Sequence, residues 1–296
     1  MNASGNVILT NRDLFILKMI FDYGGCTVDQ IRRRFFPTNG ARSACYSRIA
    51  RLVQAQYLTS LRLPSLNGVG SGRAFLTPGP KARPILAKML GVSRTELERV
   101  RLDSPIFIQH HQAVCDFRLS IDLTCDRSTA FTLQEFLGDH ELRRMPIKVT
   151  DPKTKKVISF VPDAVFTLAL RDGTEQTFIV EIDLATVSPK RCREKLRCYL
   201  VNSKNHPAPV LFVAPHYQRQ GALAQWAYEE AEKLKTDPTI FWITTKDQVS
   251  EKTILEEAIW TVVGGPKAIA LSRVARGTPE RAVLRNQPAF VGGLAE

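Results

Sequence analysis

Apolar positions in the first ninety residues recur at helical spacing, separated by short polar breaks. Between residues 10 and 25 the spacing predicts a helix capped by Thr10 and ended by a glycine pair. A second short helix is expected after the cap residue Thr27, and a third over residues 42–55. Three short helices of this kind predict a small helical domain.

Strand-like segments follow these three helices. Residues 57–63 and 73–76 are predicted to form strands, and residues 64–72 between them are rich in Pro, Gly and Ser. Three helices followed by a hairpin is the order of a winged helix-turn-helix domain, which places its third helix in the major groove of DNA. We therefore assign residues 1–90 to a winged helix.

The remainder of the chain changes from helical periodicity to a mixture of strands and helices. Residues 91–104 are expected to be a connector, and the pattern from residue 105 to 262 predicts the order α-β-β-β-α-β. The predicted elements are a helix at 106–121, strands at 131–135, 161–170 and 176–183, a helix from Ser188-Pro189 to 202, a strand at 210–213, a helix at 218–235 and a strand at 240–243. The fold class is therefore α/β (α+β).

Residues 263–296 are rich in Gly, Ala, Arg and Pro and show little periodicity. We expect this stretch to be a basic, mostly disordered tail.

Charge is distributed unequally between the two predicted domains. The chain has a formal net charge of +12, with 44% apolar and 24% charged residues. Residues 1–100 contain 15 Lys and Arg against 5 Asp and Glu, whereas the other 196 residues contain 26 against 24. A concentrated positive charge is typical of a domain that binds a polyanion, although a basic solvated surface is the plain alternative.

Hydrogen-bond donors for DNA are concentrated on the predicted third helix. Arginine pairs with guanine edges and phosphates, and serine donates to phosphates. The candidate DNA-binding residues are Arg42, Ser47, Arg48 and Arg51 on the helix and Arg73 at the base of the loop. Duplex DNA is the expected partner, and a winged helix that contacts protein instead is the alternative.

Six cysteines are present without a C-x-x-C pair or a neighbouring Cys/His set, which argues against a structural zinc site and a disulfide framework. No apolar run is long enough to span a bilayer, and the first residues lack the features of a signal peptide. We therefore expect a cytoplasmic protein without a membrane partner.

Carboxylates are placed at the ends of two neighbouring predicted strands. Glu181 and Asp183 lie two residues apart on one strand, so they project from the same face, and Asp163 stands at the start of the preceding strand. Carboxylates are hard ligands that suit Mg²⁺ or Mn²⁺, and such ions polarise phosphates and activate water. Three convergent carboxylates would form a metal site, whereas three acids at strand ends are also common as solvated rims.

The register between these two strands decides whether the carboxylates share a face. A two-residue turn at Asp172-Gly173 would pair residue 171 with 174 and place Asp163 opposite Ile182. Asp163 would then project from the face opposite to Glu181. A shared site therefore predicts that this hairpin breaks the simple Asp-Gly pattern.

A spaced set of motifs resembles a known family. Pro162-Asp163, then Glu181-Ile182-Asp183, then Lys195 with Tyr199 are similar to the replication-relaxation family of plasmid and mobile-element proteins, over roughly residues 8–260. The resemblance implies a winged helix joined to a restriction-endonuclease-like domain of the PD-(D/E)xK type. Related mobilisation proteins act as relaxases that nick DNA at a transfer origin.

The chain departs from the nuclease pattern at one position. That pattern has a lysine two residues after the glutamate, and Asp183 stands there instead. Lys195, or Lys190 nearer the start of the helix, would have to supply the cation. Tyr199 is expected to pack against the sheet rather than to attack a phosphate. The candidate catalytic residues are Asp163, Glu181, Asp183 and Lys195.

These observations lead to one hypothesis and one alternative. The hypothesis is a protein that binds duplex DNA at a plasmid or mobile-element origin, together with other replication or conjugation proteins, and acts in replication or mobilisation by metal-dependent nicking. The alternative is a non-enzymatic origin-binding or transcriptional regulator whose nuclease-like domain is inactive. The substitution of Asp183 for lysine favours the alternative, and the joint presence of Asp163, Glu181 and Lys195 favours the enzyme.

Overall fold

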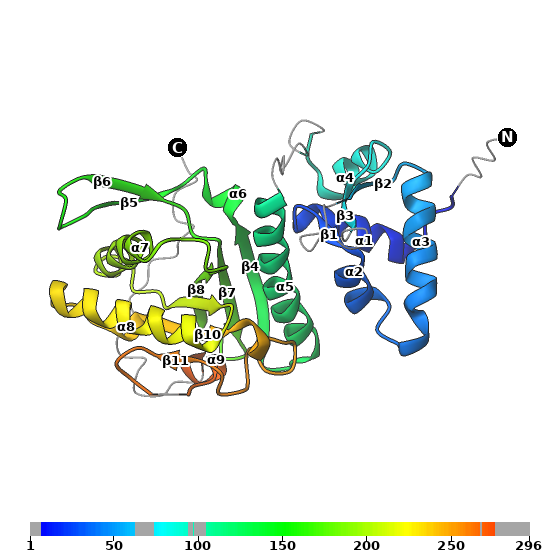
Figure 1. The fold of residues 1–296 in the computed structure, drawn as a ribbon. Coiled ribbons are helices and arrows are strands. Elements are labelled where there is room, and N and C mark those ends of the chain that lie inside the picture. Colours follow the sequence, from blue (N-terminus) through cyan, green and yellow to red (C-terminus); the bar gives the residue numbers. More distant parts are fainter. Residues whose placement is uncertain (1–6, 63–73, 94–96, 98–104, 267, 276–296) are drawn as a thin grey trace. The chain divides into compact units, whose positions relative to one another are not determined.

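The computed structural model describes residues 7–62, 74–93, 97, 105–266 and 268–275. It has a mixed α and β fold (Figure 1). The chain divides into two compact units, Met1–Leu119 and Ser120–Glu296, and the division falls within the long helix α5 (Pro105–Arg127).

The helices of the first unit lie where the apolar spacing placed them. Helix α1 (Asn11–Asp22) begins with a capping box in which Thr10 and Asp13 bond to each other's backbone N–H groups. Further described helices of this unit are α2 (Val28–Phe35), α3 (Arg42–Gln54) and α4 (Arg83–Leu90), with a short 3₁₀ turn at Asn39–Ala41. The three predicted helices are thus confirmed as α1, α2 and α3, and α3 ends one residue before its predicted end.

Among the described residues of the first unit, three strands form one sheet in the order β1-β3-β2. Strands β2 (Leu58–Arg62) and β3 (Ala74–Pro78) are antiparallel, as expected of the two predicted strands. Strand β1 (Cys26–Thr27) pairs with β3 and was not predicted, because two residues are too few to show alternation. Residues 63–73, which include the whole predicted loop and Arg73, lie outside the described residues.

The second unit is built on a sheet whose described strands follow the order β11-β10-β9-β8-β7-β4. Strands β4, β7 and β8 are antiparallel neighbours, whereas β8, β9 and β10 run parallel. The bounds are β4 (Phe131–Gly138), β7 (Ala164–Leu170), β8 (Glu175–Ile182), β9 (Val210–Ala214), β10 (Phe241–Thr245) and β11 (Thr261–Val262). The order of the predicted strands along the chain is therefore confirmed.

Helices α7 (Pro189–Asn202) and α8 (Tyr217–Leu234) cover one face of this sheet (Figure 1). Their buried side chains, such as Leu196, Leu200 and Leu223, pack with Val210 and Phe212 of β9 in one core cluster. This packing fixes α7 against β8 and β9, and it thereby determines which α7 side chains face the end of β8.

A second hairpin and several short elements lie outside the predicted pattern. Strands β5 (Ile147–Thr150) and β6 (Val157–Phe160) form a two-stranded sheet of their own, preceded by the short helix α6 (Asp139–Leu142). Each strand has four residues and lysines surround the turn, so the apolar alternation is too short to stand out. Two further 3₁₀ turns lie at Pro238–Ile240 and Lys246–Gln248.

The prediction of a disordered tail beginning at residue 263 is wrong for the residues that the structure describes there. Helix α9 spans Leu271–Ala275, Trp260 and Ile269 form a β-bridge, and Val263 and Leu271 are buried. These apolar side chains bury enough surface to be held in place, although the glycines and alanines around them hide any periodicity. Residues 276–296 lie outside the described part of the chain.

Candidate carboxylate–lysine site and the exposed face of helix α3

The β7–β8 hairpin has the register that a shared carboxylate site requires. Ala164 pairs with Val180 and Ala169 with Glu175, so a three-residue loop joins the strands in place of a two-residue turn. The Leu170 N–H donates to the Thr174 carbonyl at 2.8 Å, and Gly173 takes a positive φ of 77°. The prediction that this hairpin breaks the simple Asp-Gly pattern is confirmed.

Extending this register by one residue places Asp163 across from Glu181. Asp163 Oδ2 accepts a hydrogen bond of 2.7 Å from the Ile182 N–H, which holds the carboxylate against the end of β8. The charge of Asp163 is near enough to act on Glu181, whose pKa it helps to raise. The three-residue loop thus brings together two carboxylates that are eighteen residues apart in the sequence.

Glu181 is the most deeply buried acid of this group. It is 4% exposed, and its side chain projects from β8 toward α7. Burial, with a contribution from Asp163, raises its pKa to about 7, while Lys195 and Tyr199 oppose that shift. Near neutral pH a substantial fraction of this carboxyl group is therefore protonated, whereas an exposed glutamate is almost fully ionised.

Two side chains from one face of α7 hydrogen-bond to Glu181. The Lys195 ammonium donates to Oε2 and the Tyr199 hydroxyl donates to Oε1. They lie four residues apart, so they share a helix face as the sequence indicated. Burial disfavours the charge of Lys195, but Glu181 and Asp163 outweigh it and raise the lysine's pKa. Lys195 therefore supplies the cation of this site, whereas Lys190 is exposed in the first turn of α7.

Tyr199 packs as expected. Its side chain is 1% exposed and its ring lies edge-on to Phe160 of β6 at 4.9 Å and to Phe212 of β9 at 6.4 Å. Burial raises the pKa of its hydroxyl well above the ordinary value. A buried, protonated phenol that donates to Glu181 orients that carboxylate and is poorly placed to attack a phosphate.

Asp183 does not join the other two carboxylates in a three-ligand group. Its Oδ1 accepts from Nη2 of Arg219 on α8 at 3.3 Å, and Oδ2 accepts from Nε of the same residue. In the part of the chain that the structure describes, no three His, Cys, Asp or Glu side chains are grouped so that they could hold a metal ion. Arg219 lies 36 residues further along the chain on another helix, so nothing in the sequence around Asp183 pointed to this pairing.

The carboxylates of Asp163 and Glu181 offer oxygen atoms of the kind that Mg²⁺ takes as ligands, and the ammonium group of Lys195, which is no metal ligand, lies beside them. This ion keeps several waters and is commonly bound by one or two carboxylates together with substrate phosphates. Asp163 and Glu181 are the residues that would hold it, because they share a face and lie at the end of β8.

The exposed face of α3 carries part of the expected set of DNA-binding residues. Arg42, Ser47 and Arg51 are exposed, while Cys45, Ile49 and Leu52 are buried in the first unit. Tyr46 is also exposed on this face, with the Arg42 guanidinium 5.8 Å from the centre of its ring. This tyrosine is not among the residues predicted to bind DNA, because an aromatic residue in a helix is usually part of the core.

Arg48 has a different role from the one expected. Its Nε and Nη2 atoms donate to the carboxylate of Asp13, which is 1% exposed, and Nη2 also donates to the Ile8 carbonyl at 2.8 Å. Burial would raise the pKa of Asp13, but bonds from Arg48 and Thr10 outweigh it and lower the pKa. The guanidinium is thus committed to contacts within the first unit.

His111 belongs to the first unit and not to the carboxylate site. Its ring lies edge-on to Phe75 of β3, with 5.7 Å between ring centres. His111 of α5 therefore packs against the sheet of the first unit.

The two units together define an α+β protein with a basic helical unit and a carboxylate–lysine site. A family model described as replication-relaxation matches residues 17–206. The chain belongs to this family, as the motifs had indicated, and membership indicates a role in plasmid replication or relaxation. No curated protein and no solved structure matches the chain. None of the helices that the structure describes is both long and apolar enough to cross a membrane.

Proposed function

We propose that the chain binds duplex DNA at a plasmid or mobile-element origin and nicks it there with a divalent metal ion. The first unit acts as a winged helix, and the second acts as a nuclease-like domain of the PD-(D/E)xK type. The observation that carries this proposal is the convergence of Asp163, Glu181 and Lys195 at the end of β8.

DNA binding is supported by the chemistry of the exposed α3 face. Its arginines and serine are donors of the kind that pair with guanine edges and phosphates, and a single helix fits the major groove. The first unit also has the helix and strand order of a winged helix. The excess positive charge of residues 1–100 would draw the duplex toward this unit.

Each residue of the carboxylate site has a chemical task in this proposal. A bound Mg²⁺ or Mn²⁺ supplies a Lewis acid for the phosphate and an activated water. Asp163 and Glu181 provide negative charge on one face of the sheet. Lys195 stabilises the charge that develops on the phosphate oxygens, while Tyr199 keeps Glu181 in a fixed orientation.

The test is incubation of supercoiled origin plasmid with the full chain and Mg²⁺ or Mn²⁺. The wild type should produce relaxed circles, and Asp163→Asn, Glu181→Gln and Lys195→Met should each reduce the nicking rate at least about 100-fold. Glu175→Gln is the matched control, because Glu175 is an exposed carboxylate on the same strand. Equal rates for all five proteins would reject the assigned site.

A second candidate function is a DNA-binding regulator without nuclease activity. The pairing of Asp183 with Arg219 favours it, because a metal site then lacks a third protein carboxylate. Binding to the origin without relaxed circles in either metal ion would select this function.

A further inference from the structure

The near-neutral total charge of the second unit hides a strongly basic segment. Residues 143–160 contain six Lys and Arg and one acid, Asp151. The segment coincides with the end of α6 and the β5–β6 hairpin, whose strands extend beside α7 (Figure 1). Lys148, Lys153, Lys155 and Lys156 are all exposed.

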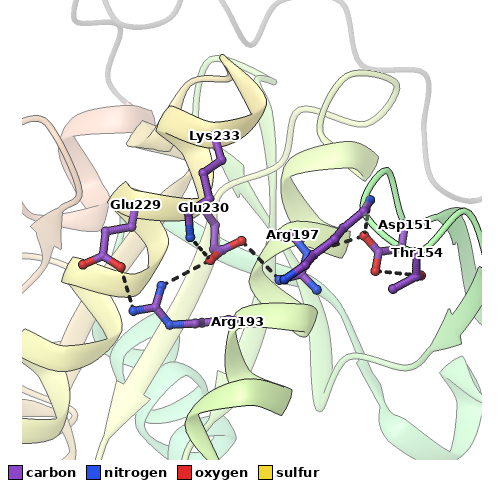
Figure 2. Close-up of polar contacts among 8 residues, drawn as sticks. Asp151, Thr154, Arg193, Arg197, Glu229, Glu230 and Lys233 are labelled. Carbon is purple, nitrogen blue, oxygen red and sulfur yellow. Dashed lines mark hydrogen bonds and ion pairs between the residues drawn. The ribbon is translucent and has the colours of Figure 1, made fainter.

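The one acid of this segment is turned inward. Asp151 is fully buried, and Arg197 of α7 donates to its Oδ1 at 3.4 Å (Figure 2). The same carboxylate accepts from the Lys153 N–H and the Thr154 hydroxyl, both at 3.0 Å, and so closes the turn. The negative charge of the hairpin is therefore neutralised inside the fold, and its cations remain outside.

Arg197 also fixes the hairpin to a larger network on α7 and α8. Its Nη1 donates to Glu230 at 3.1 Å, and Glu230 accepts from Arg193 at 3.2 Å and from Lys233 at 2.7 Å (Figure 2). Two buried carboxylates are thus held by three cations from two helices. This network gives the hairpin a defined orientation on α7, which a surface loop of the same composition would lack.

The base of the hairpin lies next to the carboxylate site. Phe160, the last residue of β6, packs edge-on against Tyr199, which hydrogen-bonds to Glu181. Asp163 follows three residues later. A molecule bound along the outer side of the hairpin would therefore run toward the residues assigned to nicking.

We propose that the β5–β6 hairpin is an arm that contacts the phosphate backbone of the duplex whose phosphodiester is presented to Asp163, Glu181 and Lys195. This inference rests on the proposed function and names a second DNA contact in addition to α3. Lys148 lies on β5, and Lys153, Lys155 and Lys156 lie in the turn that joins β5 to β6. These exposed lysines suit contacts to phosphates, since lysine binds phosphate as a point charge without base preference.

The proposed arm is tested by removing the positive charges of the hairpin's turn in the full chain. The variant K153A/K155A/K156A removes three exposed cations. The hydrogen bonds that these residues make to Asp151 come from main-chain atoms, which alanine retains. The matched control K204A/K246A/K252A removes three exposed lysines of the same unit that lie outside the hairpin. A third variant, K153R/K155R/K156R, keeps the charge.

Binding to origin duplex is measured by fluorescence anisotropy over a range of salt concentrations without divalent metal. The arm predicts that the alanine variant lowers the slope of log K against log salt by about 2 to 3 and weakens binding at least about 10-fold at low salt. The control triple and the arginine triple should keep slopes within about 1 of the wild type. A hydroxyl-radical footprint should shorten on one side in the alanine variant only.

The outcomes separate this inference from the proposed function. If the wild type binds duplex DNA and the two alanine triples change the slope equally, the hairpin is not a specific contact and the arm is rejected. An unchanged footprint in the hairpin variant rejects it as well. If the wild type itself does not bind the duplex, the proposed function fails first.

Discussion

Arg48 and Arg51 lie on successive turns of α3 and have opposite surroundings. Arg51 is exposed, whereas Arg48 forms an ion pair with a carboxylate that is almost fully buried. Removal of one partner from a buried pair typically costs about 3–5 kcal/mol, because the remaining charge has no compensation. Both residues are arginines of the same helix. Only the contact with Asp13 therefore distinguishes Arg48, which stabilises the fold, from Arg51, whose side chain is exposed to solvent.

At the residue scale, the buried carboxyl group of Glu181 makes the free energy of unfolding depend on pH. Its folded pKa, raised by burial to about 7, lies above the value of about 4.3 expected in the unfolded chain. The folded state therefore binds the proton more tightly, so this group's contribution to stability is present below the unfolded pKa and is lost as pH rises through the folded pKa. We expect the wild type to lose about 1–3 kcal/mol of unfolding free energy relative to Glu181→Gln between pH 5 and pH 8.

The measurement is urea denaturation of both proteins in EDTA across that range. Other titrating groups are common to both proteins and cancel in the difference. A difference that is constant with pH would show that Glu181 has an ordinary pKa in the folded chain.

At the scale of elements, one loop decides whether the candidate site exists. The loop after β7 has Gly173 at a φ of +77°, with nothing within 4 Å of the position where a Cβ would stand. Gly173→Ala should therefore destabilise the chain by about 1 kcal/mol through backbone strain alone. Gly221 is its matched control, because it is exposed within α8 and also has no atom within 4 Å of an added Cβ.

Gly221→Ala should stabilise the chain by about 0.5–1 kcal/mol, since alanine favours the helix and glycine does not. Chemical denaturation of the two variants checks both signs. The same sign for both substitutions would contradict the assigned loop conformation.

The predictability of these elements followed the length and regularity of their patterns. The helices α1 to α3 and the strands β7 and β8 repeat apolar residues over enough positions to be recognised, and the caps Thr10 and Thr27 mark where helices begin. The β5–β6 hairpin has four-residue strands, and β1 has two. Their stability comes from partners distant in the sequence, such as Arg197 on Asp151, which local patterns do not contain.

The candidate site was predictable to a similar degree. Strand position indicated the two carboxylates, the family resemblance indicated a lysine of α7, and the structure brings Asp163, Glu181 and Lys195 together. The ion pairs of Asp183 with Arg219 and of Arg48 with Asp13 were not predictable from the sequence, because each is a contact between separate elements. These ion pairs occupy two charged side chains that had been assigned to binding. Spacing along the chain indicates which residues share a face and leaves open which charges neutralise each other.

At the scale of the whole molecule, the charge distribution implies two separable tasks. Residues 1–100 carry most of the excess positive charge, and the carboxylate site lies in the second unit. A substitution on the α3 face should therefore change affinity for DNA, whereas one in the carboxylate site should change the nicking step. The two effects need different readouts to be told apart.

Arg51→Ala should weaken binding to the origin duplex by about 1–3 kcal/mol, if the arginine contacts a base, and leave the melting temperature unchanged because its side chain is exposed. Arg48→Ala should instead lower the melting temperature, since it leaves Asp13 buried without its partner. Asp163→Asn should keep both affinity and melting temperature near those of the wild type in metal-free buffer and lose nicking.

At DNA concentrations that saturate Arg51→Ala, its nicking rate should return to that of the wild type, because its carboxylate site is intact. Anisotropy, thermal denaturation and plasmid relaxation on the three variants measure these quantities. A nicking rate of Arg51→Ala that stays low at saturating DNA would mean that α3 also positions the DNA for cleavage, and the separation of tasks would then be wrong.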